Sequence, residues 1–306
     1  MMAHLSISIT SFLYFEGVTN LGPMLRFFRQ LRQRFLPIAI GTDNPPDQAS
    51  RAGKFSKYLL YAVGEILLVV IGILIALQID NWNEKRQEDE KIKLQLANLL
   101  RDLDGDRSGL QGLRSFHAFR VHAAYYLLDQ YGITGEITPF PEAGPIPELD
   151  ETGLYAGPVP DSTDKAFIAR GFSWLLRKNP VMPSMDAIDE FKNTGLYAEF
   201  ENQELKNKIR RYYFVYNFVF PMEDRGESNP TTRLKNALAS EGYSYLDAAV
   251  LENPVEELLS YPAHVAFIKN IIDESTYRSN QSSRLIRLLD QLIPEIENEI
   301  ENYSKN

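Results

Sequence analysis

Three acidic residues at alternate positions, Asp102, Asp104 and Asp106, come closest to a metal-binding pattern in this sequence. A calcium loop of the EF-hand type starts in this way, but it also needs glycine at its sixth position and glutamate at its twelfth. Those two positions hold Arg107 and Leu113. The pattern therefore argues against calcium, and we expect no metal here.

The histidines do not supply a metal site or a catalytic base in an evident arrangement. His117 and His122 are five residues apart, which separates them by about 140° around a helix. The sequence has no cysteine, no Gly-x-Ser-x-Gly motif and no phosphate-binding glycine loop. We therefore expect no catalytic site and no cofactor. An envelope hydrolase, which would need a buried carboxylate pair in a cleft, stays open as an alternative.

Glu65 is the ionisable residue in the most unusual surroundings, because it is the only charge in residues 58–79. At about 1.5 Å per residue this stretch is long enough for a hydrocarbon core of about 30 Å. Its Leu, Ile and Val residues outweigh the cost of inserting one carboxylate, and Trp82 suits the far interface. The stretch therefore predicts one transmembrane helix.

One side of this helix combines small residues with Glu65. Small residues let a second helix approach closely, and an ionisable group at this depth is expected to face protein or water. A protonated Glu65, or one that reaches the headgroups, is the alternative. The candidate membrane-helix interaction face consists of Gly64, Glu65, Leu68, Gly72 and Ala76.

The stretch GEILLVVIGILIALQIDNWNE, residues 64–84, resembles the signature of an uncharacterised family of bacterial single-pass membrane proteins. Its members typically begin with a short Phe/Arg-rich helix, as residues 24–36 do here. They also carry a Lys-Asn-Thr-Gly-Leu run, residues 192–196 here, before a helix that ends in Tyr-Tyr. The resemblance implies a topology and no activity. This sequence departs from it in residues 1–23 and in a Pro-rich segment, residues 133–162.

Charge is unevenly distributed around the apolar stretch. Residues 24–57 hold seven basic residues against two acidic ones, whereas the negative net charge lies from Asp80 onward. The positive-inside rule then predicts a cytoplasmic N-terminus and a periplasmic C-terminal domain at the bacterial inner membrane. Lys85 and Arg86 weaken this contrast. An acidic outer domain argues against nucleic acid as a partner.

Before the membrane helix we distinguish three segments. Residues 1–23 lack the features of a signal peptide, so they are a tail or a mis-assigned start. Residues 24–36 predict a basic amphipathic helix on the anionic inner surface, or alternatively one that binds a partner. Residues 37–57 are expected to form a flexible connector.

Beyond Trp82 the helix is expected to continue, because apolar residues recur at alternating spacings of four and three. Asp106 is the one polar interruption of this candidate seam. The seam indicates packing within the chain or, alternatively, parallel self-association. It consists of Ile92, Leu96, Leu99, Leu103, Leu110 and Leu113.

The remaining chain shows helical periodicity and no sustained strand alternation. We expect an exposed, partly ordered loop over residues 133–162 and, after it, helices over 163–178, 184–193, 203–220, 229–240 and 262–303. The predicted fold is all-α, with one transmembrane helix that extends into an antiparallel helical bundle outside the membrane, residues 80–306. An aromatic run in the third of these helices is expected in the core, with a ligand cleft as the alternative: Tyr212, Tyr213, Phe214, Tyr216, Phe218 and Phe220.

These observations favour a protein that acts by interaction. The leading hypothesis is a structural or accessory subunit of an envelope assembly, with the membrane and a second copy or another membrane protein as partners. The second is a ligand-sensing module that transmits through the continuous helix, although residues 1–57 offer no output domain.

Overall fold

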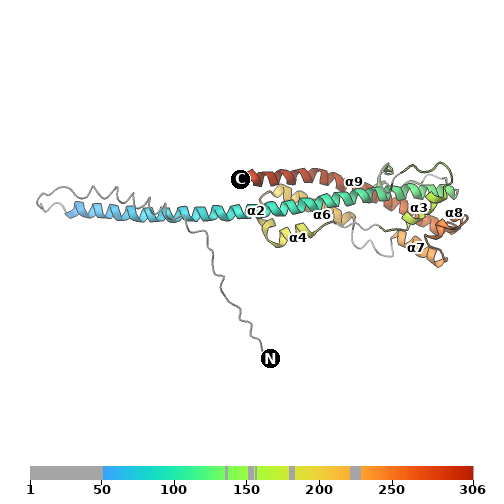
Figure 1. Cartoon of the computed structure of the whole chain (residues 1–306), viewed down its shortest axis with the longest axis horizontal. Coiled ribbons are helices and arrows are strands. Elements are labelled where there is room, and N and C mark those ends of the chain that lie inside the picture. Colours follow the sequence, from blue (N-terminus) through green and yellow to red (C-terminus); the bar gives the residue numbers. More distant parts are fainter. Residues whose placement is uncertain are drawn as a thin grey trace, which may run out of the picture. The chain divides into compact units, whose positions relative to one another are not determined.

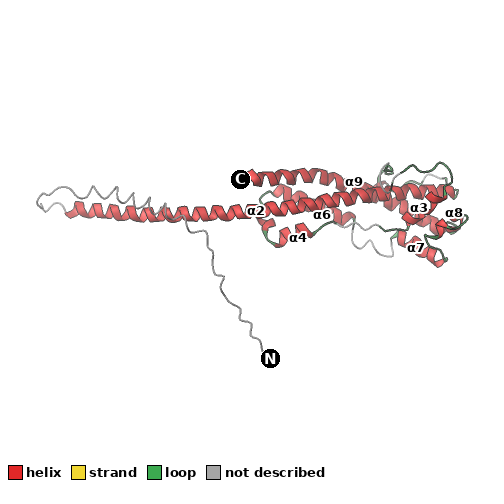
Figure 2. Ribbon diagram, in the orientation of Figure 1, coloured by secondary structure: helices red, strands yellow, loops and turns green. Residues whose placement is uncertain are grey.

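The computed structural model describes residues 51–134, 137–150, 155, 157–178, 183–220 and 229–305. It divides into two compact units, a first unit of residues 1–77 and a second unit of residues 78–306, each described by itself. Within the described ranges every regular element is a helix (Figures 1 and 2). The predicted all-α fold, with one long apolar helix and several packed helices, is therefore confirmed. The expectations for residues 1–36, and for the connector before Arg51, lie outside the described residues.

The helices begin and end close to where the sequence predicts. The helix predicted beyond Trp82 is the continuation of α2, which is one helix from Arg51 to Gln130. Two short 3-10 turns, η3 (Pro141–Ala143) and η5 (Asp247–Ala249), supplement the α-helices. The α-helices are α2 (Arg51–Gln130), α3 (Lys165–Leu175), α4 (Asp186–Asn193), α5 (Leu196–Glu199), α6 (Gln203–Val219), α7 (Pro230–Ser240), α8 (Pro254–Leu258) and α9 (Pro262–Lys305).

The first unit contains the apolar part of α2. This part of the helix is long and apolar enough to cross a membrane, and none of its most apolar window is buried in the structure. A Cβ atom added to Gly64 or Gly72 would have no neighbour within 4 Å. The chain itself therefore does not cover this helix among the described residues.

The second unit is built around α2 and α9, which run antiparallel. Arg107 of α2 forms an ion pair with Asp290 at 2.7 Å, and Ser279 donates a hydrogen bond to the Arg114 carbonyl at 3.0 Å. Residue numbers thus rise on one helix as they fall on the other. The remaining helices pack against this pair, and α6 and α7 contact α9 directly.

Apolar side chains form two clusters in this unit. The first apolar cluster joins α2 residues 92–110 to α4, α6 and α9 residues 285–296. The second apolar cluster joins α2 residues 119–128 to α3, α7, α8 and α9 residues 268–272. Between Ile272 and Leu285 the buried residues of α9 all carry a hydroxyl group: Ser275, Thr276, Ser279 and Ser282. These four residues, which we call the polar layer, separate the two apolar clusters along α9.

All six seam residues lie in the core of the second unit, and none is more than 2% exposed. Leu96, Leu99 and Leu103 pack in the first apolar cluster against α6 and α9. Packing within the chain therefore accounts for the seam, and these side chains have no free surface left for a second copy.

The Pro-rich segment contacts α2 and α9 at several of its described residues. Asn280 of α9 donates hydrogen bonds to the carbonyls of Ala143 and Pro145, each at 2.8 Å. Ser115 of α2 donates to Asp150 at 2.9 Å. These bonds attach the described part of the segment to α2 and α9 at these points.

Candidate functional site

The candidate membrane-helix face lies on the apolar part of α2. Glu65, Gly64 and Ala76 are exposed, and Leu68 and Gly72 are of intermediate exposure. Glu65 has no hydrogen-bond or ion-pair partner among the residues that the structure describes. The apolar helix thus presents a carboxylate and two open glycine positions to whatever surrounds it.

Asp106 interrupts the seam because it has specific partners inside the first apolar cluster. It is 5% exposed, and its Oδ1 accepts a hydrogen bond from the Ser184 backbone N–H at 2.8 Å. Its Oδ2 accepts one from the Tyr212 hydroxyl, also at 2.8 Å. Burial raises the pKa of Asp106, and these two hydrogen bonds oppose the rise.

Asp102, one turn earlier on α2, accepts a hydrogen bond from the Ala187 N–H at 3.1 Å. Ala187 lies in the first turn of α4, whose own N-cap residue, Met185, makes no side-chain hydrogen bond. The two carboxylates of α2 therefore supply acceptors at the start of α4, where unpaired N–H groups and the helix dipole favour negative charge. Asp104 is exposed. Asp102 and Asp106, but not Asp104, thus hold α4 and the segment before it against α2.

The aromatic run of α6 divides between two sides of the helix. Tyr212, Tyr213 and Tyr216 are buried, as predicted for core residues. The same prediction is wrong for Phe214 and Phe218, which are 71% and 73% exposed. Because α6 has 3.6 residues per turn, a run of six aromatic residues covers more of its circumference than one core can bury.

The three buried tyrosines differ in how their hydroxyl groups are satisfied. Tyr213 donates to the Ser184 carbonyl at 3.1 Å, so segment 183–185 is held by α6 as well as by α2. The Tyr216 hydroxyl has no partner in the described part of the chain. Burial, followed by the charge of Asp106, raises the pKa of Tyr212, Tyr213 and Tyr216. All three therefore keep their hydroxyl proton and are not phenolates.

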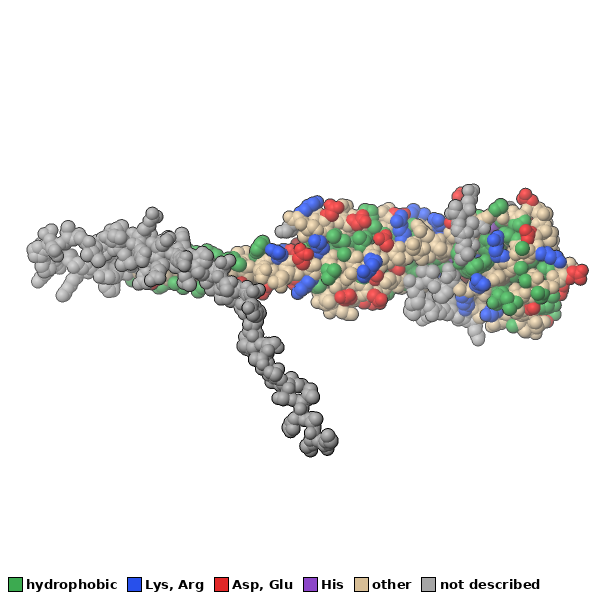
Figure 3. All heavy atoms as spheres, viewed as in Figure 1, with side chains coloured by type: hydrophobic (Ala, Val, Ile, Leu, Met, Phe, Trp, Pro, Cys, Tyr) green, Lys and Arg blue, Asp and Glu red, His purple; other side chains and the backbone are tan. Residues whose placement is uncertain are grey.

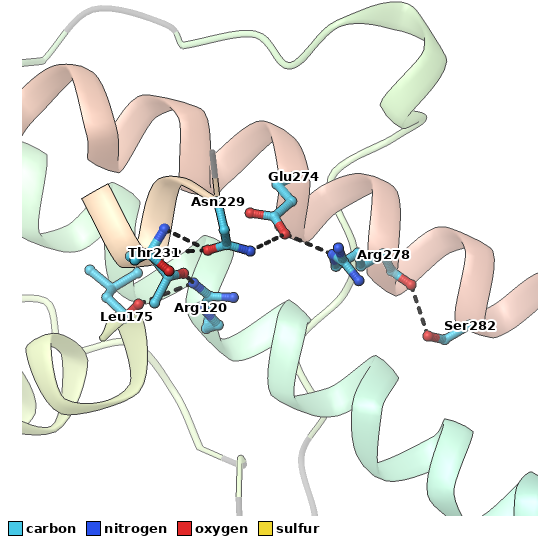
Figure 4. A network of polar contacts seen from close by, with 8 residues as sticks. Arg120, Leu175, Asn229, Thr231, Glu274, Arg278 and Ser282 are labelled. Atoms are coloured by element: carbon cyan, nitrogen blue, oxygen red, sulfur yellow. Dashed lines mark hydrogen bonds and ion pairs between the residues drawn. The ribbon is translucent and has the colours of Figure 1, made fainter. Parts of the chain in front are cut away.

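A second polar group lies near the polar layer and joins four helices (Figure 4). Arg120 of α2, 3% exposed, donates to the Leu175 carbonyl of α3 at 3.0 Å and to the Thr231 hydroxyl of α7. Glu274 of α9 forms an ion pair with Arg278 at 2.8 Å. Asn229, the N-cap residue of α7, donates a hydrogen bond to Glu274 at 3.4 Å and so links α9 to α7. We call these six residues the arginine network.

Burial dominates the electrostatics of the arginine network. It lowers the pKa of Arg120 and of Arg278 to about 10, and it raises the pKa of Glu274. His117, one turn before Arg120, is 4% exposed, and its pKa lies well below the usual value because of burial and the two nearby guanidinium groups. His117 is therefore neutral at physiological pH.

His122, the other histidine of α2 considered as a metal ligand, contacts the Pro147 carbonyl through Nε2 at 2.8 Å. Within the described ranges, no three His, Asp or Glu side chains are placed to hold one metal ion. The histidines of α2 thus have separate surroundings, as their spacing indicates.

An acidic hollow of about 210 Å³, which no sequence pattern indicates, opens on the second unit. Lys85 of α2 forms an ion pair there with Glu201 at 3.1 Å. The hollow brings together residues that are distant in the sequence. Its lining consists of Asn81, Glu84, Lys85, Glu88, Asp89, Ile92, Glu199, Glu201 and Tyr303. On the face in Figure 3, acidic and basic side chains are interspersed over the second unit.

Comparison with known proteins gives a family match over one region of the chain and no activity. No curated protein and no solved structure matches the chain. One region of the chain, residues 65–132, matches a family model, and this region holds Glu65, Asp106 and Arg120. The resemblance seen around the apolar helix is confirmed to this extent: a family of unknown function matches there. Residues 65–132 match the family described as "Family of unknown function (DUF6090)".

Proposed function

We propose that this chain is a single-pass membrane protein that acts by protein–protein interaction, as a structural or accessory subunit of an assembly in the bacterial envelope. One observation carries the proposal: Glu65 lies in an apolar helix of which no part of the most apolar window is buried. A carboxylate in such a helix is costly in lipid unless it faces protein or water. A partner helix at this face would offset that cost.

The glycines support the same face. Gly64 and Gly72 lie two turns apart, and an added Cβ at either would contact nothing among the residues that the structure describes. Helices in lipid associate through close packing, which small residues permit. The partner that we propose is a second copy of this chain or another membrane protein.

The proposed orientation places residues 24–57 in the cytoplasm and residues 80–306 in the periplasm. The excess of arginine and lysine before the apolar stretch supports it. We propose no catalytic role, because the paired carboxylates on α2, Asp102 and Asp106, both accept hydrogen bonds from backbone N–H groups. They are engaged in holding α4.

Crosslinking in native membranes, followed by purification and mass spectrometry, tests the proposal. The wild type is compared with Glu65→Gln and with Gly72→Ile, which adds bulk where the chain has open space. Leu74→Ile, about 200° around the helix from Gly72, is the control. We expect a defined crosslinked partner that is lost in the first two variants and kept in the control. The same products in all four proteins would refute the proposal.

A second candidate, a ligand sensor, is favoured by the course of α2. This single helix contains the apolar stretch and also Asp106 and Arg120, which hold other helices of the second unit. A ligand of the second unit would then act on the same helix that enters the membrane. Screening for ligands that raise the thermal unfolding midpoint of the full chain tests this role. If no ligand raises the midpoint, the sensor role is rejected and only the first candidate function remains.

A further inference from the structure

The outer side of α6 carries a stripe of arginine and phenylalanine that the core does not use. Phe214 and Phe218, one turn apart, stack with ring centroids 6.4 Å apart and ring planes 17° apart. Arg210 and Arg211 lie one turn before them and are also exposed. We call these four residues the α6 outer face.

This face is fixed by the residues on the other side of the helix. Ile209, Tyr212 and Tyr216 are at most 1% exposed, and Tyr212 donates its hydroxyl hydrogen bond to Asp106. Rotation of α6 to bury the phenylalanines would bring these core residues into water. The two phenylalanine rings therefore remain at the surface, side by side, in the folded chain.

The charged side chains of α6 also differ between the side toward α9 and the exposed side. Lys208, which lies toward α9, forms ion pairs with Glu204 at 2.9 Å and with Glu295 at 2.8 Å. In the part of the chain that the structure describes, neither Arg210 nor Arg211 forms an ion pair, and Arg210 bonds only to the neutral Asn207. Two guanidinium groups beside two exposed rings thus remain available on a domain whose overall charge is negative.

We infer that the α6 outer face binds an acidic, apolar segment of another protein. Phenylalanine and arginine are enriched in protein interfaces, where rings fill apolar pockets and guanidinium groups pair with carboxylates. A second copy fits less well, because a symmetric contact places the same patch against itself and would bring four guanidinium groups together. This inference rests on the proposed function and names a partner chemistry for the second unit.

The chain has no cysteine, so a single introduced thiol can carry a photo-crosslinker next to this face. Asn217→Cys, exposed on α6, is labelled with benzophenone maleimide in the purified full chain in lipid nanodiscs. Glu252→Cys is the control label, beside the exposed apolar residues Leu246 and Val250. Both proteins are illuminated after incubation with a detergent extract of the native membranes.

We expect the label on α6, and not the control label, to form one product with another protein. The crosslinked peptide of that protein must contain carboxylates next to apolar residues. Arg210→Glu with Arg211→Glu, and separately Phe214→Ser with Phe218→Ser, should each lower the yield about tenfold. Leu246→Ser with Val250→Ser should leave it unchanged. Raising the ionic strength about tenfold should also lower the yield of the crosslinked product when the α6 outer face is unmutated.

Four results would overturn the inference: a product between two copies, a product with lipid only, a yield equal to that of the control label, or a yield that charge reversal does not change. The positions are exposed, so equal thermal unfolding midpoints are expected for the variants and the parent. The outcome is separate from that of the membrane-helix test, because Glu65→Gln and Gly72→Ile leave the α6 outer face intact. If the α6 crosslink is absent while the membrane-helix crosslink forms, the inference is refuted and the proposed function stands.

Discussion

The Tyr212 hydroxyl and the Asp106 carboxylate lie 2.8 Å apart in the first apolar cluster, although 106 residues separate them in the sequence. Asp106 also accepts the Ser184 N–H, so one buried carboxylate joins α2, α6 and the segment before α4. Because an unsatisfied buried acceptor is costly, this geometry favours one register between the helices.

Tyr212→Phe removes one of the two hydrogen-bond donors to Asp106 and leaves the rest of the ring in place. We expect a loss of about 1–3 kcal/mol in the free energy of unfolding, measured by urea denaturation. Tyr216→Phe is the matched control, because the Tyr216 hydroxyl has no partner among the described residues. It should be neutral or stabilising. Equal losses in the two variants would show that the Asp106 contact contributes nothing specific.

Asp106→Asn tests the effect of burial on this carboxylate. Its pKa in the folded chain is raised above the ordinary value of 3.8, so the folded state holds the proton more tightly than the unfolded state. The stabilisation that Asp106 contributes is fully present below pH 3.8, and it is lost as pH rises through the pKa of Asp106 in the folded chain. Relative to Asp106→Asn, the wild type should therefore become less stable as pH rises from 3.8. Parallel curves of unfolding free energy against pH would contradict this.

His117 should produce the opposite dependence on pH. Its pKa in the folded chain lies well below 6.5, so below pH 6.5 the unfolded state takes up a proton that the folded state does not. Its contribution is complete above pH 6.5 and is lost as pH falls toward the folded pKa. His117→Gln should remove this loss. Urea denaturation between pH 7 and the acid limit measures it, and an unchanged acid slope would contradict the assignment.

Arg120→Met should be destabilising, because Arg120 joins α2 to α3 and α7 and lies near Glu274. We expect a loss of about 3 kcal/mol in the free energy of unfolding. Arg170→Met is the control: Arg170 is exposed and lies over the rings of Phe119 and Phe167. It should cost less than about 1 kcal/mol. A neutral Arg120→Met would mean that the arginine network does not hold these helices.

Local signals in the sequence account for most of the helical elements. The start of α6 follows from Asn202, whose side chain accepts the Leu205 N–H at 3.0 Å. The α2 seam follows from apolar spacing, and all six of its residues are buried. The apolar stretch around Glu65 likewise indicates a membrane helix from composition alone.

Contacts between distant residues could not be predicted in this way. Asp106 breaks the apolar pattern, and nothing near it in the sequence indicates that Tyr212 would satisfy it. Phe214 and Phe218 have the composition of core residues, and only the packing of Tyr212 and Tyr216 determines that they face outward. The acidic hollow joins residues near 85, 200 and 303, so it depends on the tertiary fold.

The mass of the complex that contains this chain tests the central claim most directly. The full chain is extracted from its native membranes in nanodiscs without detergent, and the protein mass is measured for the wild type and for Glu65→Gln. Assembly through the membrane helix predicts a mass above that of one 35.0 kDa chain for the wild type and a fall toward 35.0 kDa for the variant. A wild type at 35.0 kDa, or the same larger mass in both proteins, would contradict the claim.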